Sequence, residues 1–221
     1  MSDRKQPKVG RPATSTPAQL LDRLVSAAVE ILSEQAADAD FSVAQLAQRA
    51  GVSKRTVYTV VAGKEELIAQ IIARGAQLAT TMLELPVPNA IAAREVLARF
   101  LRAWTVFACG PQAVGVYVMA IRERSRYPAI GEAYYSSRNT HGLLPLAAWL
   151  RRMQDKGFLP PEDPLVVAEL ALTMAAAERQ RILALGMHEP FTDEQLERRV
   201  EAVLRFVFQD SATSPTGVKT L

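Results

Sequence analysis

Along most of the chain, apolar residues recur every three or four positions, the spacing that places side chains on one face of an α-helix. Leu20, Leu24, Ala28 and Ile31 form the first such series, and comparable series continue to about residue 209. No segment shows sustained alternation of apolar and polar residues with turn signals on both sides, as a strand would. The pattern therefore predicts an all-α fold.

Capping residues, glycines and prolines divide this pattern into separate helices. Thr16 precedes Pro17, which suits a first helical position, and Ser42 and Ser53 are both typical N-caps. Gly51 tolerates the left-handed conformation that often ends a helix. We expect helices at about 17–35, 43–50, 54–60, 64–85, 89–108, 111–125, 128–157, 163–187 and 192–209.

The segment from residue 41 to 72 has the spacing of a helix-turn-helix. Two short helices that cross steeply need a small residue at the crossing, which Ala47 provides, and a turn residue free to take positive φ, which Gly51 provides. Val52 and Val57 are expected to fill the space between the two helices. The motif, at about residues 40–59, predicts a helix that fits the DNA major groove.

The polar residues of this segment are the expected DNA contacts. Serines at helix N-termini suit phosphate binding, because free backbone N–H groups and the helix dipole favour an anion there. The first 16 residues hold clustered bases and no apolar periodicity, so we expect a flexible basic arm that follows the DNA backbone. The candidate contacts are Ser42, Ser53, Lys54, Arg55, Thr56, Tyr58, Lys64 and, in the arm, Arg11.

The same residues resemble the DNA-binding domain of TetR-family transcriptional regulators. The pattern here is Ser-Val-Ala-Gln-Leu-Ala, Ala-Gly-Val-Ser, Thr-Val-Tyr and Gly-Lys-Glu-Glu-Leu, and it covers residues 17–77. The resemblance implies an N-terminal three-helix head joined by a connecting helix to a C-terminal domain at 86–210. That domain would bind a small-molecule inducer and pair two copies through their last two long helices. Residues 211–221 are expected to be a disordered tail.

The chain departs from the family pattern at two adjacent positions. After the tyrosine and one variable residue, the family usually has an aromatic residue or histidine and then phenylalanine, where this chain has Val60 and Val61. Val61 can still belong to the core. Val60 cannot donate to a phosphate, so the resemblance does not supply that contact here.

The C-terminal two-thirds carry weaker signals. Residues 122–138 and 146–172 resemble the C-terminal domains of one large TetR subgroup. An apolar cavity lined by aromatic residues and methionine would suit a hydrophobic or aromatic inducer. The candidate lining residues are Trp104, Phe107, Tyr117, Met119, Tyr134 and Met174. The alternative for each of them is an ordinary core position.

Composition narrows the remaining classes. The net charge is +3, and the single cysteine, Cys109, excludes an internal disulfide and a zinc site of several cysteines. No catalytic glycine-rich, GxSxG or HExxH pattern occurs, so we expect no enzyme activity, no metal and no cofactor. No signal-peptide pattern and no sufficiently long apolar run occur, so we expect a cytoplasmic protein that does not enter the membrane.

These signals give one leading hypothesis and two alternatives. The leading hypothesis is a homodimeric repressor that binds a double-stranded DNA operator and is released by a small molecule. The first alternative is an activator, or a DNA-binding regulator controlled by a partner protein. The second is a helical small-molecule binding protein whose helix-turn-helix is vestigial, which only Val60 favours.

Overall fold

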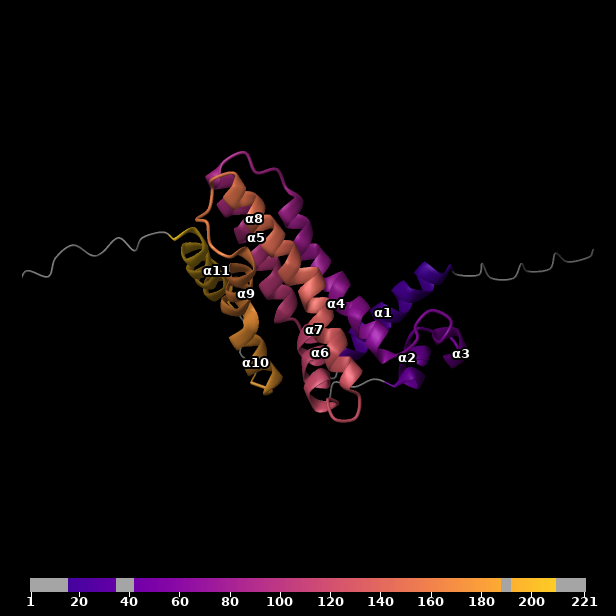
Figure 1. The fold of residues 1–221 in the computed structure, drawn as a ribbon. Helices are drawn as coiled ribbons and strands as arrows, with labels where there is room; N and C mark the ends of the chain where they lie inside the picture. The colour runs from indigo at the N-terminus through magenta and orange to yellow at the C-terminus, as the bar shows by residue number, and fades with distance from the viewer. Residues whose placement is uncertain (1–15, 35–41, 188–191, 210–221) are drawn as a thin grey trace, which may run out of the picture.

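The computed structural model describes residues 16–34, 42–187 and 192–209, and within them the chain is helical, with no β-strand (Figure 1). The expected arm, which includes Arg11, and the expected C-terminal tail lie outside the described residues. The elements are α1 (Pro17–Glu34), α2 (Val43–Arg49), α3 (Lys54–Val57), α4 (Lys64–Thr80), the 3₁₀-helix η1 (Thr81–Glu84), α5 (Ala90–Ala108), α6 (Pro111–Arg122), α7 (Pro128–Arg138), the π-helix η2 (Asn139–Leu143), α8 (Leu144–Asp155), α9 (Pro164–Leu172), the π-helix η3 (Thr173–Ala177), α10 (Glu178–Ala184) and α11 (Asp193–Phe208).

Several expected helices differ from the observed ones; the helix expected at 111–125, for example, ends at Arg122. The helix expected to reach about Val60 stops at Val57, because the Thr59 hydroxyl donates to the Thr56 carbonyl and the next amides bond three residues back. The helix expected to reach residue 85 becomes a 3₁₀-helix after Thr80. The expected helices 128–157 and 163–187 each contain a π-turn, and the second ends at Ala184.

The N-terminal head is built from α1, α2, α3 and the first half of α4. Leu24, Leu46, Val57 and Ile68 are among its buried side chains, each at most 1% exposed. Figure 1 shows α2 and α3 at one end of the molecule and α9 and α11 on the opposite side. The short helices therefore stand away from the rest of the chain on an apolar support.

The C-terminal core lies among α5, α8, α9 and α11. Phe100, Leu97, Trp149 and Leu146 are completely buried in it. A bidentate ion pair between Arg102 of α5 and Glu197 of α11 fixes the outer edge of the same layer. This core is apolar and closely packed, so it provides a rigid frame for the parts that surround it.

The two cores share elements. Val116 and Met119 of α6 and Ile130 of α7 are buried in the core of the head, although they belong to the C-terminal part of the sequence. The half-buried ring of Phe107 on α5 contacts both cores. Helix α4 runs from the head along the C-terminal helices (Figure 1). The head is thus packed directly against α6 and α7 as well as connected through α4.

Among the described helices, none is by itself long and apolar enough to cross a membrane. One pair, Ala90–Ala108 with Pro111–Arg122, meets the length and composition criteria only when taken together across a 58° bend. Much of that pair forms the buried cores described above, as expected for core helices of a folded domain.

Candidate DNA-binding and ligand sites

The turn between α2 and α3 is fixed by backbone hydrogen bonds. Gly51 has φ +64°, the Val52 amide donates to the Ala47 carbonyl at 2.9 Å, and the Gly51 amide donates to Gln48 at 3.1 Å. This pair of bonds is the Schellman arrangement that ends a helix. Arg23 of α1 donates to the Ala50 carbonyl from the other side. The angle between α2 and α3 is therefore held by both the turn and α1.

Side-chain caps begin both short helices. The Ser42 hydroxyl accepts from the Gln45 amide at 3.1 Å, and the Gln45 side chain accepts from the Ser42 amide at 2.8 Å. The Ser53 hydroxyl accepts from the Thr56 amide at 3.0 Å. Both serines are exposed, so each hydroxyl caps its helix and also faces solvent.

The structure brings the candidate contacts of α3 to one exposed end of the head. Lys54 and Arg55 are exposed, and Tyr58 is 59% exposed although tyrosine carries a large apolar ring. Thr56 and Lys64 are half-buried. Cations and an aromatic donor at the tip of a helix-turn-helix are the groups that contact phosphates and base edges.

An ion-pair network braces α2 from behind. Arg49 of α2 donates to both carboxylate oxygens of Glu34 on α1, at 2.8 and 2.7 Å, and to Glu30 at 3.3 Å. These hydrogen bonds from Arg49 hold the pKa of Glu34 below its usual value. Because Arg49 is engaged with α1, its role here is to position α2.

The two valines that depart from the family pattern lie at the base of α3. Val61 is 3% exposed and belongs to the core of the head, and Val60 is half-buried against the same core. Just beyond them, the Glu66 carboxylate accepts from the Ala62 amide at 2.7 Å and so caps the start of α4. Val60 therefore contributes packing at this position.

An apolar cavity lies between α4, α5, α7 and the α9–α10 helix. Its volume is about 50 Å³. Aromatic rings dominate one part of the wall, where the Trp104 and Phe107 rings meet edge to face at 6.0 Å. The lining residues are Ile72, Trp104, Phe107, Ala108, Ala113, Tyr134, Arg138, Leu172, Ala176, Ala177 and Gln180.

Three lining residues bring polar groups to this cavity. The Tyr134 hydroxyl lies 3.5 Å from the side-chain oxygen of Gln180, and the side-chain NH₂ of Gln180 donates to the Ala108 carbonyl at 2.9 Å. Arg138 follows Tyr134 by one helical turn and lines the same cavity. Burial raises the pKa of the Tyr134 phenol, and the charge of Arg138 acts against that shift.

Two glycines allow the aromatic rings to sit where they do. A Cβ atom at Gly75 of α4 would lie 1.9 Å from the Phe107 ring, and one at Gly142 of η2 would lie 2.3 Å from the Trp104 ring. Both distances are far shorter than van der Waals contact, so each ring occupies the space of a missing side chain. Phe107, which lines the cavity, therefore rests directly on the backbone of the helix that leads to the head.

The candidate ligand residues divide into two groups. Trp104, Phe107 and Tyr134 line this cavity. The Tyr117 ring contacts the Tyr134 ring, with centroids 5.8 Å apart, and lies behind it. Met119 is buried in the core of the head, and Met174 is 36% exposed on η3, so neither lines the cavity.

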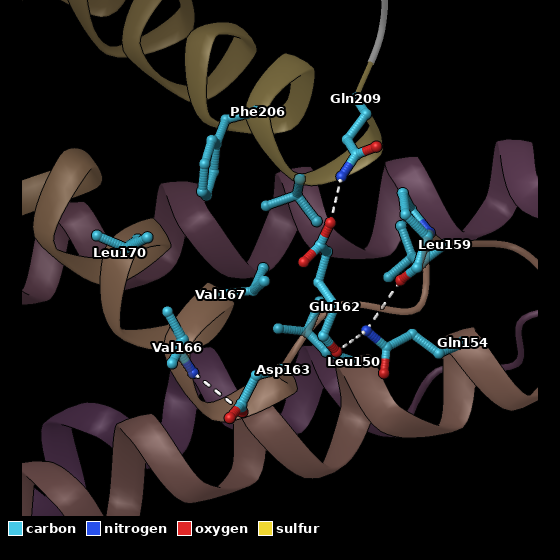
Figure 2. A pocket seen from close by; sticks show the side chains of 12 residues that line it. Leu150, Gln154, Leu159, Glu162, Asp163, Val166, Val167, Leu170, Phe206 and Gln209 are labelled. Atoms are coloured by element: carbon cyan, nitrogen blue, oxygen red, sulfur yellow. Dashed lines mark hydrogen bonds between the residues drawn. The ribbon is translucent and has the colours of Figure 1, made fainter.

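A second concave feature lies on the opposite side from the head. It is a groove of about 330 Å³ between α8, α9 and α11, and Figure 2 shows Val166, Leu170 and Phe206 on its walls. These three side chains are 50%, 43% and 38% exposed. Val166, Leu170 and Met174 form an apolar stripe at four-residue spacing along α9 and η3. Together with Phe206 of α11 they make up the surface that we call the α9–α11 face.

Comparison with known proteins assigns the architecture. Residues 24–71 match the family described as bacterial regulatory proteins, tetR family, and residues 95–209 match the AefR-like transcriptional repressor C-terminal domain. The second match alone covers more than half of the 221 residues. The chain belongs to the TetR family of transcriptional regulators. No curated protein matched the sequence.

Solved structures share the TetR-family fold over most of the chain. A TetR-family regulator from Mesorhizobium loti MAFF303099 is 20% identical, with a TM-score of 0.69 over 87% of this chain and 96% of that one. The flavonoid-responsive regulator FrrA is 28% identical, with a TM-score of 0.59 over 86% and 95%. RolR in complex with resorcinol is 15% identical, with a TM-score of 0.57 over 86% and 88%. Through its two family matches the chain is a DNA-binding transcriptional regulator, and these structures share its fold.

Sequence reasoning missed the polar lining residues Arg138 and Gln180 in the cavity of this TetR-family protein. The two residues lie on different helices, and Gln180 follows the π-helix η3. A π-turn changes which face the following residues present, so a continuous helical pattern misplaces Gln180. The signal that was available is the four-residue spacing from Tyr134 to Arg138.

Cys109 provides a first prediction, because it is the single cysteine of the chain. Its thiol lies 3.9 Å from the Ala176 carbonyl, and burial raises its pKa to about 11 from 9.0. We expect iodoacetamide at pH 8 to alkylate the folded protein about 100-fold more slowly than the urea-unfolded protein, because the thiolate reacts and the thiol does not. Mass spectrometry of timed samples measures both rates, and equal rates would contradict the burial.

Proposed function

We propose that this regulator is a homodimeric repressor that a small-molecule ligand releases from its operator. The observation that carries the proposal is the wall of the aromatic cavity. Ile72 of α4 lines it, and Phe107 rests on Gly75 of the same helix. A ligand that moves Phe107 acts directly on the helix that holds the DNA-binding head. The match to a C-terminal domain described as that of a transcriptional repressor supports repression over activation.

In this proposal the exposed tip of the head contacts DNA. Lys54, Arg55 and Tyr58 would reach base edges and phosphates in the major groove, with Ser42 and Ser53 donating to the flanking backbone. Thr56 and Lys64 are half-buried, so their contacts would lie at the edge of the surface. Arg11, which lies outside the described residues, remains a proposed contact of the arm.

The α9–α11 face supports the homodimer. Contiguous exposed apolar side chains are costly in water and commonly mark a protein interface. Pairing two copies through this face would place two heads on the same side of the dimer, as a palindromic operator requires. The proposed symmetric unit is a four-helix bundle of α9–α10 and α11 from each copy.

Release follows from the close packing between the cavity and α4. A ligand shifts an equilibrium only by its difference in affinity between two states. A ligand that widens the cavity displaces the Phe107 ring. Because there is no gap between this ring and Gly75, either α4 moves with the ring or the ring turns. We propose that the widened state holds the two heads at a spacing that does not fit the operator.

The ligand class proposed here is small and aromatic. Trp104, Phe107 and Tyr134 offer ring faces and edges, and Leu172 and Ile72 complete an apolar wall. Two proteins of this fold carry names that point the same way, one as flavonoid-responsive and one in complex with resorcinol.

The test begins with operator selection from random DNA by the purified full-length protein. Fluorescence anisotropy on the selected operator then screens aromatic compounds for release. Transcription from a promoter carrying that operator should fall on adding protein and recover on adding the releasing compound. If transcription rises on adding protein, the chain is an activator and not a repressor. If no DNA is selected at moderate salt, the result favours a small-molecule binding protein whose helix-turn-helix is vestigial.

Tyr58 gives a specific test of the contact surface. Because its ring is 59% exposed, a Tyr58→Ala variant should fold and assemble normally. We expect about a 10- to 100-fold loss of operator affinity, the range for one specific base or backbone contact made twice in a dimer. The matched control is Tyr135→Ala on α7, a tyrosine that is 65% exposed outside the head. Equal operator affinity of both variants would remove Tyr58 from the contact set.

A further inference from the structure

The charge distribution in the aromatic cavity is one-sided. Arg138 is the one ionisable side chain other than the Tyr134 phenol among the residues that line it, and no carboxylate lines it. Arg138 forms no ion pair within the described residues, and Glu178, which does not line the cavity, is paired with Arg181 at 2.6 Å. A half-buried guanidinium next to an apolar wall is costly to leave without an anion.

The neighbouring groups form a matching set of hydrogen-bond donors. Arg138 carries five N–H donors in a planar fork, and the Tyr134 hydroxyl lies one helical turn away on the same side of α7. That hydroxyl has only a long contact, 3.5 Å, to Gln180, so a better acceptor can replace it. Gln180 itself is held in place by its bond to the Ala108 carbonyl.

The aromatic part of the cavity wall favours ring systems. The Trp104 and Phe107 rings meet at an interplanar angle of 68°, and Trp104 also stacks on Phe100 at 6.1 Å with an angle of 21°. These contacts orient the two rings, so their exposed faces and edges suit a flat apolar body. The cavity thus combines one cationic side chain with aromatic and apolar walls.

We propose that the ligand of this cavity is an aromatic anion, whose carboxylate or phenolate is bound by Arg138 and Tyr134 and whose ring packs against Trp104 and Phe107. This inference rests on the proposed ligand-responsive function and names the chemistry of its ligand. It excludes cationic aromatic compounds, which would meet Arg138 with no balancing carboxylate among the lining residues.

The test compares matched acids and amides with one, two and three rings: benzoate with benzamide, 2-naphthoate with 2-naphthamide, and anthracene-2-carboxylate with its amide. Binding to the full-length protein is measured by calorimetry and by quenching of tryptophan fluorescence. For at least one ring size we expect the acid to bind about 10- to 100-fold more tightly than its amide, the range for a charge-assisted hydrogen bond.

Arg138→Gln is expected to remove this preference, so that acid and amide bind within about threefold of each other, with little change for the amide. Arg151→Gln is the matched control, because it removes the same charge from an exposed position on α8 outside the cavity. The inference is overturned if no acid binds more tightly than its amide, or if Arg138→Gln and Arg151→Gln retain the same preference.

The readouts separate this inference from the function on which it rests. Acids that bind with the expected dependence on Arg138 but leave the protein on its operator would uphold the anion site and contradict release by ligand. Amides or amines that release the operator, with no acid binding, would uphold release and overturn the anion site. Acids that bind and also release the operator would support both.

Discussion

A Leu170→Glu, Phe206→Glu variant is expected to be monomeric and to lose operator binding by about 100-fold or more. Both side chains are exposed on the α9–α11 face, at 43% and 38%, so the substitutions place two charges on a surface without disturbing a core. In a dimer they would bring four carboxylates into an apolar contact, where each lacks a partner. The loss is large because two linked heads bind one operator far more tightly than a single head does.

Light scattering coupled to size-exclusion chromatography measures the assembly, and anisotropy measures operator affinity. The control is Leu78→Glu, which adds a charge at an exposed leucine on α4, 73% exposed and away from the α9–α11 face. Circular dichroism should show the same helix content for all three proteins. A dimer that persists in the double variant at micromolar concentration would place the interface elsewhere.

A Gly75→Ala variant is expected to fold but to lose its response to ligand. The added methyl group would lie 1.9 Å from the Phe107 ring, and the ring's open direction is the cavity, which measures about 50 Å³. Overpacking costs about 1–3 kcal/mol, whereas alanine favours a helix over glycine by about 0.5–1 kcal/mol, so the net change is about 0–2.5 kcal/mol of destabilisation. Operator binding should remain, because the Phe107 ring is expected to turn into the cavity while α4 keeps its place.

Thermal unfolding and ligand titration measure the two effects. Gly131→Ala on α7 is the matched control, because no atom lies within 4 Å of its added Cβ, so it should be neutral or slightly stabilising. Combining Gly75→Ala with Phe107→Leu should restore part of both stability and ligand binding, since the smaller side chain relieves the overlap. Normal ligand response in Gly75→Ala alone would show that Phe107 does not transmit the signal.

The helix-turn-helix could be predicted in detail because its determinants are local. Ala47, Gly51 and Val57 each act through a turn or through a neighbour a few residues away, and the structure gives Gly51 a φ of +64° and leaves Val57 1% exposed. The all-α fold and the TetR-family assignment followed from similarly local patterns, and both are confirmed.

The ligand cavity could be predicted only in part because its wall is assembled from distant helices. Trp104 and Phe107 stand out as large aromatic residues on an apolar helix, and both line the cavity. Met119 has the same apolar character and yet packs into the head, because α6 contributes to that core. Arg138 and Gln180 line the cavity from distant helices, and Gln180 follows the π-helix η3, which changes the face that its helix presents in a way that periodicity does not reveal.

The small volume of the cavity has a consequence for the speed of the switch. Pockets for drug-sized ligands measure about 300–1,000 Å³, well above the cavity seen here. A ring can therefore bind only after Phe107 or α4 has moved, and that opening step takes place with or without ligand. The observed rate of association should then rise with ligand concentration at first and level off at the opening rate. Such a regulator would respond after a fixed delay that no amount of ligand shortens.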